Sequence, residues 1–421
     1  MEGGAIPRIK ELLHRIGAKQ AKYYCVMDLT SGYHQTPVDP ESIKYTAFVT
    51  SAGVFEWVRV PMGLKGAPTY FQREMSNTVL GGLIGYGVEL YIDDCIVYGG
   101  TEEELVQNLR KVFERFKAFN VTLNPKKCRF GCQSIEYVGH VIDKDGIRLT
   151  RSKIEQVLNF ETPVVLKDLA SFIGLVIWFG DHISHLADEL KPLREMEAEA
   201  RKSKKLKWTD ERRQRFEKIK RLVNDLPTLY FLNDTGTVRV YTDASDYAIG
   251  GFVCQVIDGK ERAVGFMSKT LTKGQRKWST TERECYAIFM TFQKYEYLLR
   301  DIPFELYTDH ENLIYINTPP SNKVLRWKLA IQEYDFTRNH IAGEQNIVAD
   351  GLSRLTEDIP TTKECFPDSK LPHEGKPNDN IIIDRDQTSR EHVGHDINSQ
   401  SSLATPHLKK SRRNRKKVKM S

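Results

Sequence analysis

Two adjacent carboxylates inside an apolar run are the feature that most constrains this chain. The run extends from Val88 to Tyr98 and reads VELYIDDCIVY, so Asp93 and Asp94 lie between two short segments rich in β-branched and aromatic residues. Such segments are typical of strands, which predicts a hairpin with the acidic pair at its bend. Neighbouring carboxylates repel each other and are costly to bury, and for acids alone a hard cation such as Mg²⁺ is the usual partner. A polar turn is the other interpretation of the pair taken by itself.

Further acids follow predicted strands elsewhere in the chain. A strand over 23–29 carries Asp28 near its end, in the same third of the chain as the acidic pair. A second group lies later, where strands over 238–242 and 304–308 precede two acids and helices over 280–299 and 345–352 carry two more. The members of this group are Asp243, Asp309, Glu284 and Asp350. Carboxylates gathered at strand ends can hold two divalent ions for phosphoryl transfer or phosphodiester hydrolysis, whereas any single one of them could be a helix cap or a surface acid.

The remaining pattern predicts alternating helices and strands. Apolar residues at helical spacing predict a helix over 6–17. A Pro at position 68 suits the first turn of a second helix. Thr101 with Glu104 fits a capping box at the start of a third. A strand pair is expected over 45–49 and 54–60, with a turn over 30–35, and another pair over 137–142 and around Ile147. The stretch 152–226 is mostly helical in pattern. After residue 355 large apolar residues become scarce, which predicts disorder over 356–421.

Composition limits the compartment and the partners. The chain has 421 residues, 40% of them hydrophobic, with no run of 18 apolar residues and no signal-type start, so neither a membrane partner nor secretion is expected. Seven scattered cysteines indicate a reduced, intracellular compartment, and the C-x₃-C pair Cys128 and Cys132 has no second pair that would indicate zinc. The last 13 residues hold eight Lys or Arg, so without them the net charge of +6 becomes −2. Such a tail is typical of a nucleic-acid or nuclear-import patch, or of a solvated end with no partner.

Seven short motifs occur in a fixed order along the chain. They are DLTSGYHQ at 28–35, PMGLKGAP at 61–68, YIDD at 91–94, YTDAS at 241–245, ERE at 282–284, YTDH at 307–310 and NIVADGLSR at 346–354. The first three together resemble the reverse transcriptase of gypsy-type long-terminal-repeat retrotransposons and their retroviral relatives. The last four resemble the ribonuclease H (RNase H) domain that follows it. The resemblance extends from about residue 6 to residue 354.

The resemblance implies roles for residues of the first region. Asp28, Asp93 and Asp94 match the metal-binding triad of the polymerase. Tyr33 matches the aromatic residue that excludes a 2′-hydroxyl from the incoming sugar, with a core tyrosine as the alternative that the motif context disfavours. The loop that includes Met62 and Gly63 matches the segment beside the templating base and incoming nucleotide. Either of two adjacent lysines matches the basic residue near the triphosphate, and a hairpin matches the element that holds the primer end. The two lysines are Lys126 and Lys127. The hairpin residues are Tyr137, Val138, Gly139 and His140.

The resemblance also implies roles in the second region. Asp243, Glu284, Asp309 and Asp350 match four metal-binding acids of the nuclease, and His340 matches a loop histidine that assists product release, with a surface histidine as the alternative. Two Mg²⁺ or Mn²⁺ ions are implied at each active site. The implied partners are an RNA template, a DNA primer, the RNA–DNA hybrid and deoxynucleoside triphosphates (dNTPs).

The predicted fold is multidomain, combining α+β and α/β parts. A palm-type polymerase core with partial fingers is expected over 1–148, a helical and mixed thumb or connection over 149–226, an RNase H-like domain over 227–355, and a disordered polar tail over 356–421 with a basic end. Compared with the family, the chain begins almost at the first motif and has neither a protease before nor an integrase after. It is therefore expected to be part of a larger polyprotein or a truncated copy.

The expected function is RNA-directed DNA synthesis with cleavage of the RNA strand of the hybrid, as in retrotransposon replication. The alternative is a nucleic-acid-binding remnant that does not polymerise and retains at most RNase H activity. Complete carboxylate sets favour the enzyme, and the short fingers favour the remnant for polymerisation. The expected location is intracellular, in the cytoplasm or, given the basic tail, the nucleus.

Overall fold

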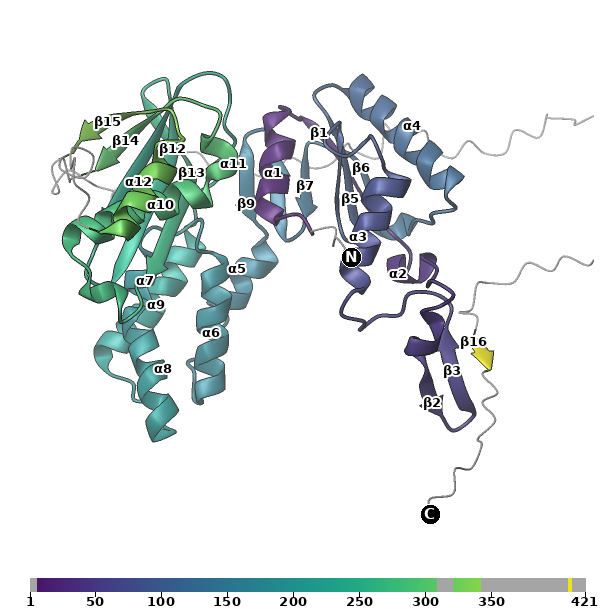
Figure 1. Ribbon diagram of the computed structural model, residues 1–421, viewed down its shortest axis with the longest axis horizontal. Coiled ribbons are helices and arrows are strands. Elements are labelled where there is room, and N and C mark those ends of the chain that lie inside the picture. The colour runs from purple at the N-terminus through teal and green to yellow at the C-terminus, as the bar shows by residue number, and fades with distance from the viewer. Residues whose placement is uncertain (1–5, 309–320, 342–407, 411–421) are drawn as a thin grey trace, which may run out of the picture.

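The structure is a computed structural model, and it describes residues 6–308, 321–341 and 408–410. Within these ranges the strands form four sheets, which are accompanied by separate groups of helices (Figure 1). None of the helices described is both long and apolar enough to cross a bilayer.

A four-stranded antiparallel sheet, in the order β4-β5-β1-β6, carries the acidic hairpin. Its inner strands β1 (Tyr23–Asp28) and β5 (Asp94–Gly99) are apolar on both faces because both faces are covered. Helices α3 and α4 cover one face, while α1 and a second hairpin cover the other. The other elements of this unit are α1 (Ile9–Ala18), α2 (Gly32–Gln35), α3 (Ala67–Arg73) with a π-helical turn (Glu74–Val79), β4 (Val88–Tyr91), α4 (Glu102–Ala118) and β6 (Arg129–Cys132).

The strand pair expected near residue 50 is present but shorter than predicted. It consists of β2 (Phe48–Thr50) and β3 (Gly53–Trp57). Tyr45 and Thr46, where the first strand was expected to begin, belong instead to a 3₁₀ turn (Ile43–Thr46). The reason is Thr46, whose Oγ1 accepts the Trp57 N–H at 2.8 Å and donates to the Ile43 carbonyl at 2.7 Å. Strand β16 (Leu408–Lys410) pairs with the open edge of β3, so the prediction of disorder is wrong for these three residues. An unpaired edge offers backbone groups to any extended segment.

A second sheet and a group of helices follow. The sheet has the order β10-β9-β8-β7, and its tightest turn joins β7 (Ser134–Tyr137) to β8 (His140–Asp143). The predicted helical stretch forms a bundle whose core includes Phe172 and Phe216, with ring centroids 4.5 Å apart. The remaining elements are β9 (Gly146–Leu149), β10 (Leu229–Tyr230), α5 (Arg151–Leu158), α6 (Leu166–Trp178), α7 (Leu186–Glu189), α8 (Lys191–Ser203) and α9 (Asp210–Asn224).

The last unit is a five-stranded mixed sheet in the order β13-β12-β11-β14-β15. The helix expected over 280–299 is broken at Tyr295, because this buried residue leaves the helical conformation and its hydroxyl donates to the Phe266 carbonyl at 2.8 Å. The elements are β11 (Thr237–Ala244), β12 (Ala248–Ile257), β13 (Lys260–Thr270), α10 (Thr280–Lys294), α11 (Glu296–Leu299), β14 (Phe304–Thr308), α12 (Asn322–Ile331) and β15 (Phe336–His340).

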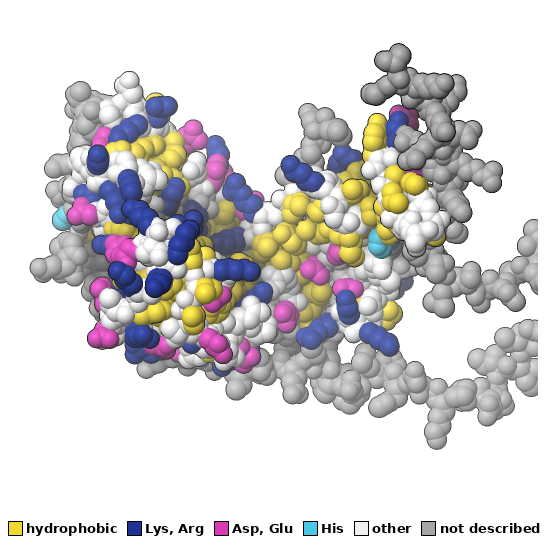
Figure 2. All heavy atoms as spheres, turned by 90° about the horizontal axis from the view of Figure 1, so that it is seen from below, with side chains coloured by type: hydrophobic (Ala, Val, Ile, Leu, Met, Phe, Trp, Pro, Cys, Tyr) yellow, Lys and Arg dark blue, Asp and Glu magenta, His cyan; other side chains and the backbone are white. Residues whose placement is uncertain are grey.

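The bundle helices and the β2–β3 hairpin project to the same side of the sheets (Figure 1). Seen from that side, the surface is hollowed between the two projections, and Lys and Arg side chains gather on the bundle side of the hollow (Figure 2). Strand β5, which begins with Asp94, belongs to the sheet between them. This arrangement can receive an extended polyanion.

Candidate active sites

The bend of the acidic hairpin is held by a buried glutamine. Tyr91 pairs with Asp94, so Ile92 and Asp93 form a two-residue turn, and Ile92 has a positive φ of 54°. A β-branched residue rarely adopts this conformation. Gln72 on α3 stabilises it, because its Oε1 accepts the Ile92 N–H at 2.6 Å and its Nε2 donates to the Leu90 carbonyl at 3.1 Å.

The three acids of the first set lie on neighbouring backbone segments. Asp28 ends β1 and is the cross-strand partner of Asp94 in β5, and Asp93 precedes Asp94 in the turn. The Oδ1 atom of Asp93 is buried and has no hydrogen-bond partner in the described part of the chain. It faces Gly32, where an added Cβ would lie 3.0 Å away, so the glycine makes room for this carboxylate.

Repulsion among these acids contributes to the raised pKa values of Asp93 and Asp94. Burial, and then the charges of Asp94 and Asp28, raise the pKa of Asp93. Burial and the charge of Asp28 also raise the pKa of Asp94, against the opposing effect of Lys127. The Nζ atom of Lys127 lies 3.4 Å from Asp28 Oδ2. Lys127 therefore offsets charge at Asp28 and Asp94 but is given no such effect on Asp93, and the site favours additional positive charge.

The donor set suits a hard divalent cation completed by a ligand. Among the described residues, no three His, Cys, Asp or Glu side chains converge closely enough to enclose a metal ion by themselves. Mg²⁺ does not require such a cage, because it is commonly held by one or two carboxylates together with substrate phosphates. The unpartnered Asp93 oxygen and the repulsion among the three acids fit an ion of this kind.

Of the other residues implied for nucleotide binding, Tyr33 and Lys127 are linked to this acidic site. Tyr33 on α2 packs edge-on against Phe71, with centroids 5.2 Å apart, and burial followed by the Asp93 charge raises its pKa. Met62 is 68% exposed, and Gly63, with φ of 93°, has open space around it. Of the two candidate lysines, the structure brings Lys127 to Asp28 and gives Lys126 no such contact.

The described part of the second set contains Asp243 and Glu284. Asp243 lies near the end of the central strand β11, opposite Gly250 of β12, and Glu284 is 2% exposed in the second turn of α10. Helix α10 packs closely on the sheet, since a Cβ on Gly251 would lie 2.2 Å from Thr291 Oγ1. Asp309 and Asp350 lie outside the described residues.

Two consecutive side chains at the start of α10 make separate contacts that fix this end of the helix. Glu282 completes a capping box with Ser279 and also binds Lys323 at 3.0 Å. Arg283 donates to the Ser245 carbonyl at 3.1 Å and pairs with Asp246. Ser245 and Asp246 lie two and three residues after Asp243. Arg283 therefore fastens the helix that carries Glu284 to the turn that follows Asp243.

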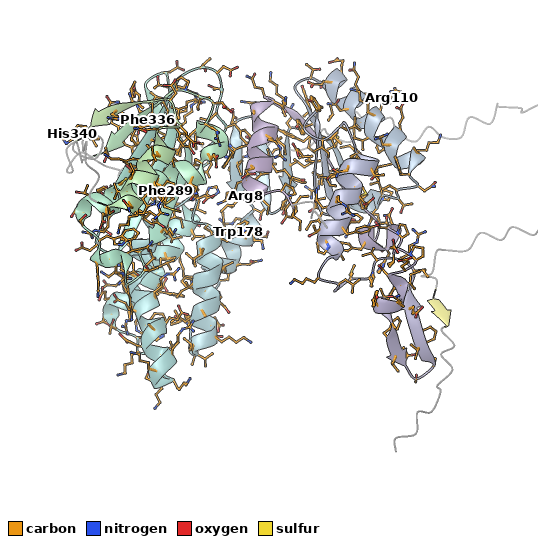
Figure 3. All side chains as sticks on the ribbon, viewed as in Figure 1. Arg8, Arg110, Trp178, Phe289, Phe336 and His340 are labelled. Carbon is orange, nitrogen blue, oxygen red and sulfur yellow. The ribbon has the colours of Figure 1, made fainter. Side chains whose placement is uncertain are left out.

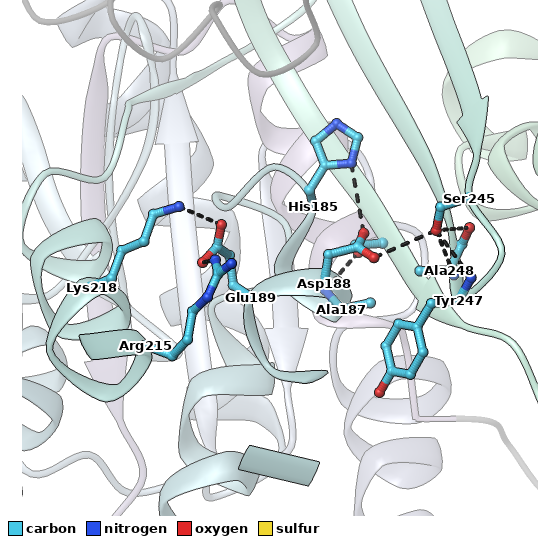
Figure 4. A network of polar contacts seen from close by, with 10 residues as sticks. His185, Ala187, Asp188, Glu189, Arg215, Lys218, Ser245, Tyr247 and Ala248 are labelled. Carbon is cyan, nitrogen blue, oxygen red and sulfur yellow. Dashed lines mark hydrogen bonds and ion pairs between the residues drawn. The ribbon is translucent and has the colours of Figure 1, made fainter. Parts of the chain in front are cut away.

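Residues of α7 also reach this turn, and nothing in their sequence pattern predicted it. The Ser245 hydroxyl contacts Asp188 Oδ1 at 3.5 Å and accepts the Ala248 N–H at 2.9 Å (Figure 4). His185 lies 4.0 Å from the Asp188 carboxylate and packs over Gly250. The charge of Asp243 contributes to the raised pKa of Asp188, after the larger effect of burial. The bundle therefore contacts the second acidic site.

Comparisons with protein families match both units. Residues 5–142 match the model described as reverse transcriptase (RNA-dependent DNA polymerase), and residues 233–334 match the RNase H-like domain found in reverse transcriptase. The chain carries a reverse transcriptase domain and an RNase H-like domain. Each matched segment contains one of the two acidic sites described above. The boundaries expected at 148 and 226 stay predictions.

Curated relatives agree with this identification. The chain is 34% identical over 355 residues to the retrovirus-related Pol polyprotein from transposon 412 of Drosophila melanogaster, covering 83% of this chain and 28% of that protein. It is 31% identical over 369 residues to the Tf2-3 polyprotein of Schizosaccharomyces pombe, covering 85% and 27%. The chain thus spans about a quarter of the length of these relatives.

The fold resembles that of foamy viral protease–reverse transcriptase. A structure of that protein in complex with an RNA/DNA hybrid superposes with a TM-score of 0.68 at 21% identity, covering 87% of this chain and 49% of that one. A complex with double-stranded DNA gives 0.67 at 21%, covering 82% and 72%. The predicted multidomain fold class, with a palm-type core and an RNase H-like domain, is confirmed.

In the hairpin expected to hold the primer end, the two turn residues are half-buried and the two residues that flank them are buried. Val138 and Gly139 form its turn, both with positive φ, as a type I′ turn requires. Tyr137 and His140 are buried, and the Tyr137 hydroxyl donates to the Asp94 carbonyl at 3.2 Å. The hairpin of the reverse transcriptase domain is therefore joined directly to its acidic site.

His340, the histidine expected to assist product release, ends β15. Figure 3 shows it at the outer end of the RNase H-like sheet. It pairs in register with Thr308, the residue before Asp309. The role of His340 in product release stays a prediction.

Proposed function

We propose that this chain is an RNA-directed DNA polymerase that also cleaves the RNA strand of RNA–DNA hybrids, and that it derives from a gypsy-type long-terminal-repeat retrotransposon. The observation that carries the proposal is the presence on one chain of two separate acidic sites, each in its own matched domain. Asp28, Asp93 and Asp94 form the first, and Asp243 and Glu284 belong to the second. The substrates are an RNA template, a DNA primer and dNTPs.

At the first site, Asp28, Asp93 and Asp94 would hold two Mg²⁺ or Mn²⁺ ions, which activate the primer 3′-hydroxyl and neutralise the phosphates. The residues of the chain position the reactants. Tyr33, which packs against the buried ring of Phe71, would lie against the sugar, and Lys127, 3.4 Å from Asp28, would offset charge on the departing pyrophosphate. The hairpin of Val138 and Gly139 supports the primer end.

At the second site, Asp243 and Glu284, with Asp309 and Asp350, would hold the ions that activate a water for attack on the RNA phosphodiester. The anchored turn around Ser245 fixes Asp243 and the start of α10 together. We further propose an intracellular location, because six of the cysteines are unpaired thiols in the described residues and the C-terminal residues are strongly basic.

The proposal is tested by a single reaction that contains the chain, an RNA template, a shorter DNA primer, dNTPs and Mg²⁺ or Mn²⁺. Elongated DNA and shortened RNA are expected, and both products should disappear in EDTA. Shortened RNA without elongated DNA would support the second activity and contradict the first. The absence of both products would contradict the proposal.

A further inference from the structure

Two lysines from distant parts of the chain meet at one carboxylate. Lys10 lies on α1 of the reverse transcriptase domain, Asp181 follows α6 of the bundle, and Lys294 ends α10 of the RNase H-like domain. The Lys294 Nζ atom lies 2.7 Å from Asp181 Oδ1, and Lys10 pairs with Asp181 Oδ2. This cluster, called here the junction triad, joins all three regions.

The junction triad is built into a rigid frame. The Asp181 side chain is 12% exposed and that of Lys294 27%. The backbone of Phe266 on β13 bonds to both residues. Its N–H donates to the Asp181 carbonyl at 2.9 Å, and its carbonyl accepts a hydrogen bond from Lys294 Nζ at 2.6 Å. The same carbonyl accepts the Tyr295 hydroxyl at 2.8 Å, at the break between α10 and α11.

Burial makes it costly for the two lysines of the junction triad to carry a charge, and this shows in their pKa values. Burial lowers the pKa of Lys294 to about 7, and burial together with Lys294 lowers that of Lys10 to about 7. The adjacent His14 and His182, with pKa values lowered by burial to about 4 and about 3, add no positive charge at neutral pH. A buried ion pair contributes little net stability, and its orientation-dependent attraction is better suited to selecting one arrangement of its parts.

The junction triad is also connected to the primer-end hairpin. Together with Asp181 and Lys10, the residues His140 and Trp178 line a small cavity of about 30 Å³. The rings of His140 and Trp178 lie 5.2 Å apart, and Trp178 is at the end of α6 (Figure 3). His140 begins the strand that follows the hairpin turn. A continuous set of packed residues therefore runs from the primer-end hairpin to α10.

We propose that Lys10, Asp181 and Lys294 are positioning residues that hold the RNase H-like domain at a fixed placement relative to the primer-end hairpin. They would thereby set the distance, along a bound hybrid, between the primer 3′ end and the point of RNA cleavage. This inference rests on the proposed function. It assigns to the three residues neither substrate contact nor a chemical step.

The test maps RNA cleavage on a hybrid whose DNA has a recessed 3′ end. With Lys294→Met, which keeps most of the apolar stem and removes the charge, the dominant cleavage position should lose at least half of its share to neighbouring positions. Total cleavage of a short blunt hybrid should stay within twofold of the unaltered chain. Lys144→Met, which breaks an exposed ion pair with Asp145 inside one turn, is the matched control and should leave the cleavage pattern unchanged.

Lys10→Met provides a second variant, because Lys10 is 48% exposed and its loss disturbs packing less. A cleavage pattern unchanged in both folded variants would overturn the inference, and so would equal loss of all activity in both.

Scanning calorimetry gives a readout that needs no activity. Lys294→Met should separate the unfolding of the RNase H-like domain from that of the rest of the chain, and one unchanged transition would contradict the inference. A chain that cleaves no hybrid would contradict the proposed function, and calorimetry would still decide the role of the junction triad.

Discussion

At the scale of single residues, the acids were predictable from the sequence and the groups that hold them were not. Asp93 and Asp94 are conspicuous because charged pairs are rare inside apolar strands. Gln72 gives no such signal, since a glutamine on a helix is ordinary, and its bond to Ile92 spans 20 residues. Only the three-dimensional structure shows that this side chain offsets the strain at the bend.

Gln72→Ala is predicted to reduce primer extension by roughly 10- to 100-fold, because a shift of about 1 Å in Asp93 is enough for such a loss. It should also destabilise the chain by about 1–3 kcal/mol, since two backbone groups lose their buried partner. Gln107→Ala, at an exposed position of α4, is the matched control. Extension rates and thermal unfolding measure the two effects, and a folded Gln72→Ala chain with undiminished extension would refute the role of Gln72 in holding the bend.

Asp93→Asn is predicted to raise the melting temperature of the metal-free chain at pH 7.5 by roughly 1–2 °C. The pKa of Asp93 is raised in the folded chain, so the folded state binds more protons than the unfolded state above pH 3.8, and stability falls as the pH rises through the raised pKa. The difference should therefore shrink as the pH is lowered toward 3.8. Added Mg²⁺ should stabilise the original chain more than the variant. A lower melting temperature for the metal-free variant at pH 7.5 would contradict this account.

At the scale of elements, periodicity and end signals predicted most helices and strands, and tertiary contacts account for the differences. The strand ending at Asp28, the hairpin at Asp93 and the helix after Pro68 are present. Thr46 draws its segment into a 3₁₀ turn through a bond to Trp57, and Tyr295 breaks a helix by bonding to Phe266. Both causes lie far along the chain or in another layer, where a local pattern carries no information.

Ser279→Ala is predicted to remove the cap of α10 and destabilise the chain by about 1 kcal/mol. Because this helix carries Glu284, hybrid cleavage should fall while primer extension stays near its original rate. Thr101→Ala removes the equivalent cap of α4, where Thr101 Oγ1 accepts the Glu104 N–H at 3.2 Å, and should cost similar stability without affecting cleavage. Denaturant unfolding and both activity assays measure these effects. Equal loss of cleavage in the two variants would argue against a specific link between the cap and the nuclease site.

At the scale of the whole molecule, the order of the motifs predicted two catalytic units, whereas their connection could not be predicted. The capping box expected at Thr101 is half formed, because Glu104 accepts the Gly100 N–H instead of that of Thr101. The α7 contacts at Ser245 and the junction triad join residues more than fifty positions apart. Nothing local in the sequence distinguishes Asp181 or Asp188 from a surface acid.

Deleting residues 411–421 is predicted to flatten the salt dependence of hybrid binding. The deletion removes six Lys or Arg and keeps strand β16. Each phosphate contact that the tail makes contributes roughly −0.7 to −0.9 to the slope of log K against log salt concentration. Replacement of the same six residues by Gln, at constant length, should have an equal effect. An unchanged slope in both variants would show that these charges do not touch the nucleic acid.

The central claim, that two independent metal-dependent sites act on one hybrid, is tested most directly by two variants in one assay. Asp93→Asn should abolish primer extension and leave RNA cleavage intact, and Asp243→Asn should abolish cleavage and leave extension intact. Each isosteric change removes one carboxylate from one domain and keeps the fold. The measurement follows labelled DNA and labelled RNA in the same reaction. The reciprocal pattern is the predicted result, whereas loss of both activities in either folded variant, or of neither activity, would contradict the account.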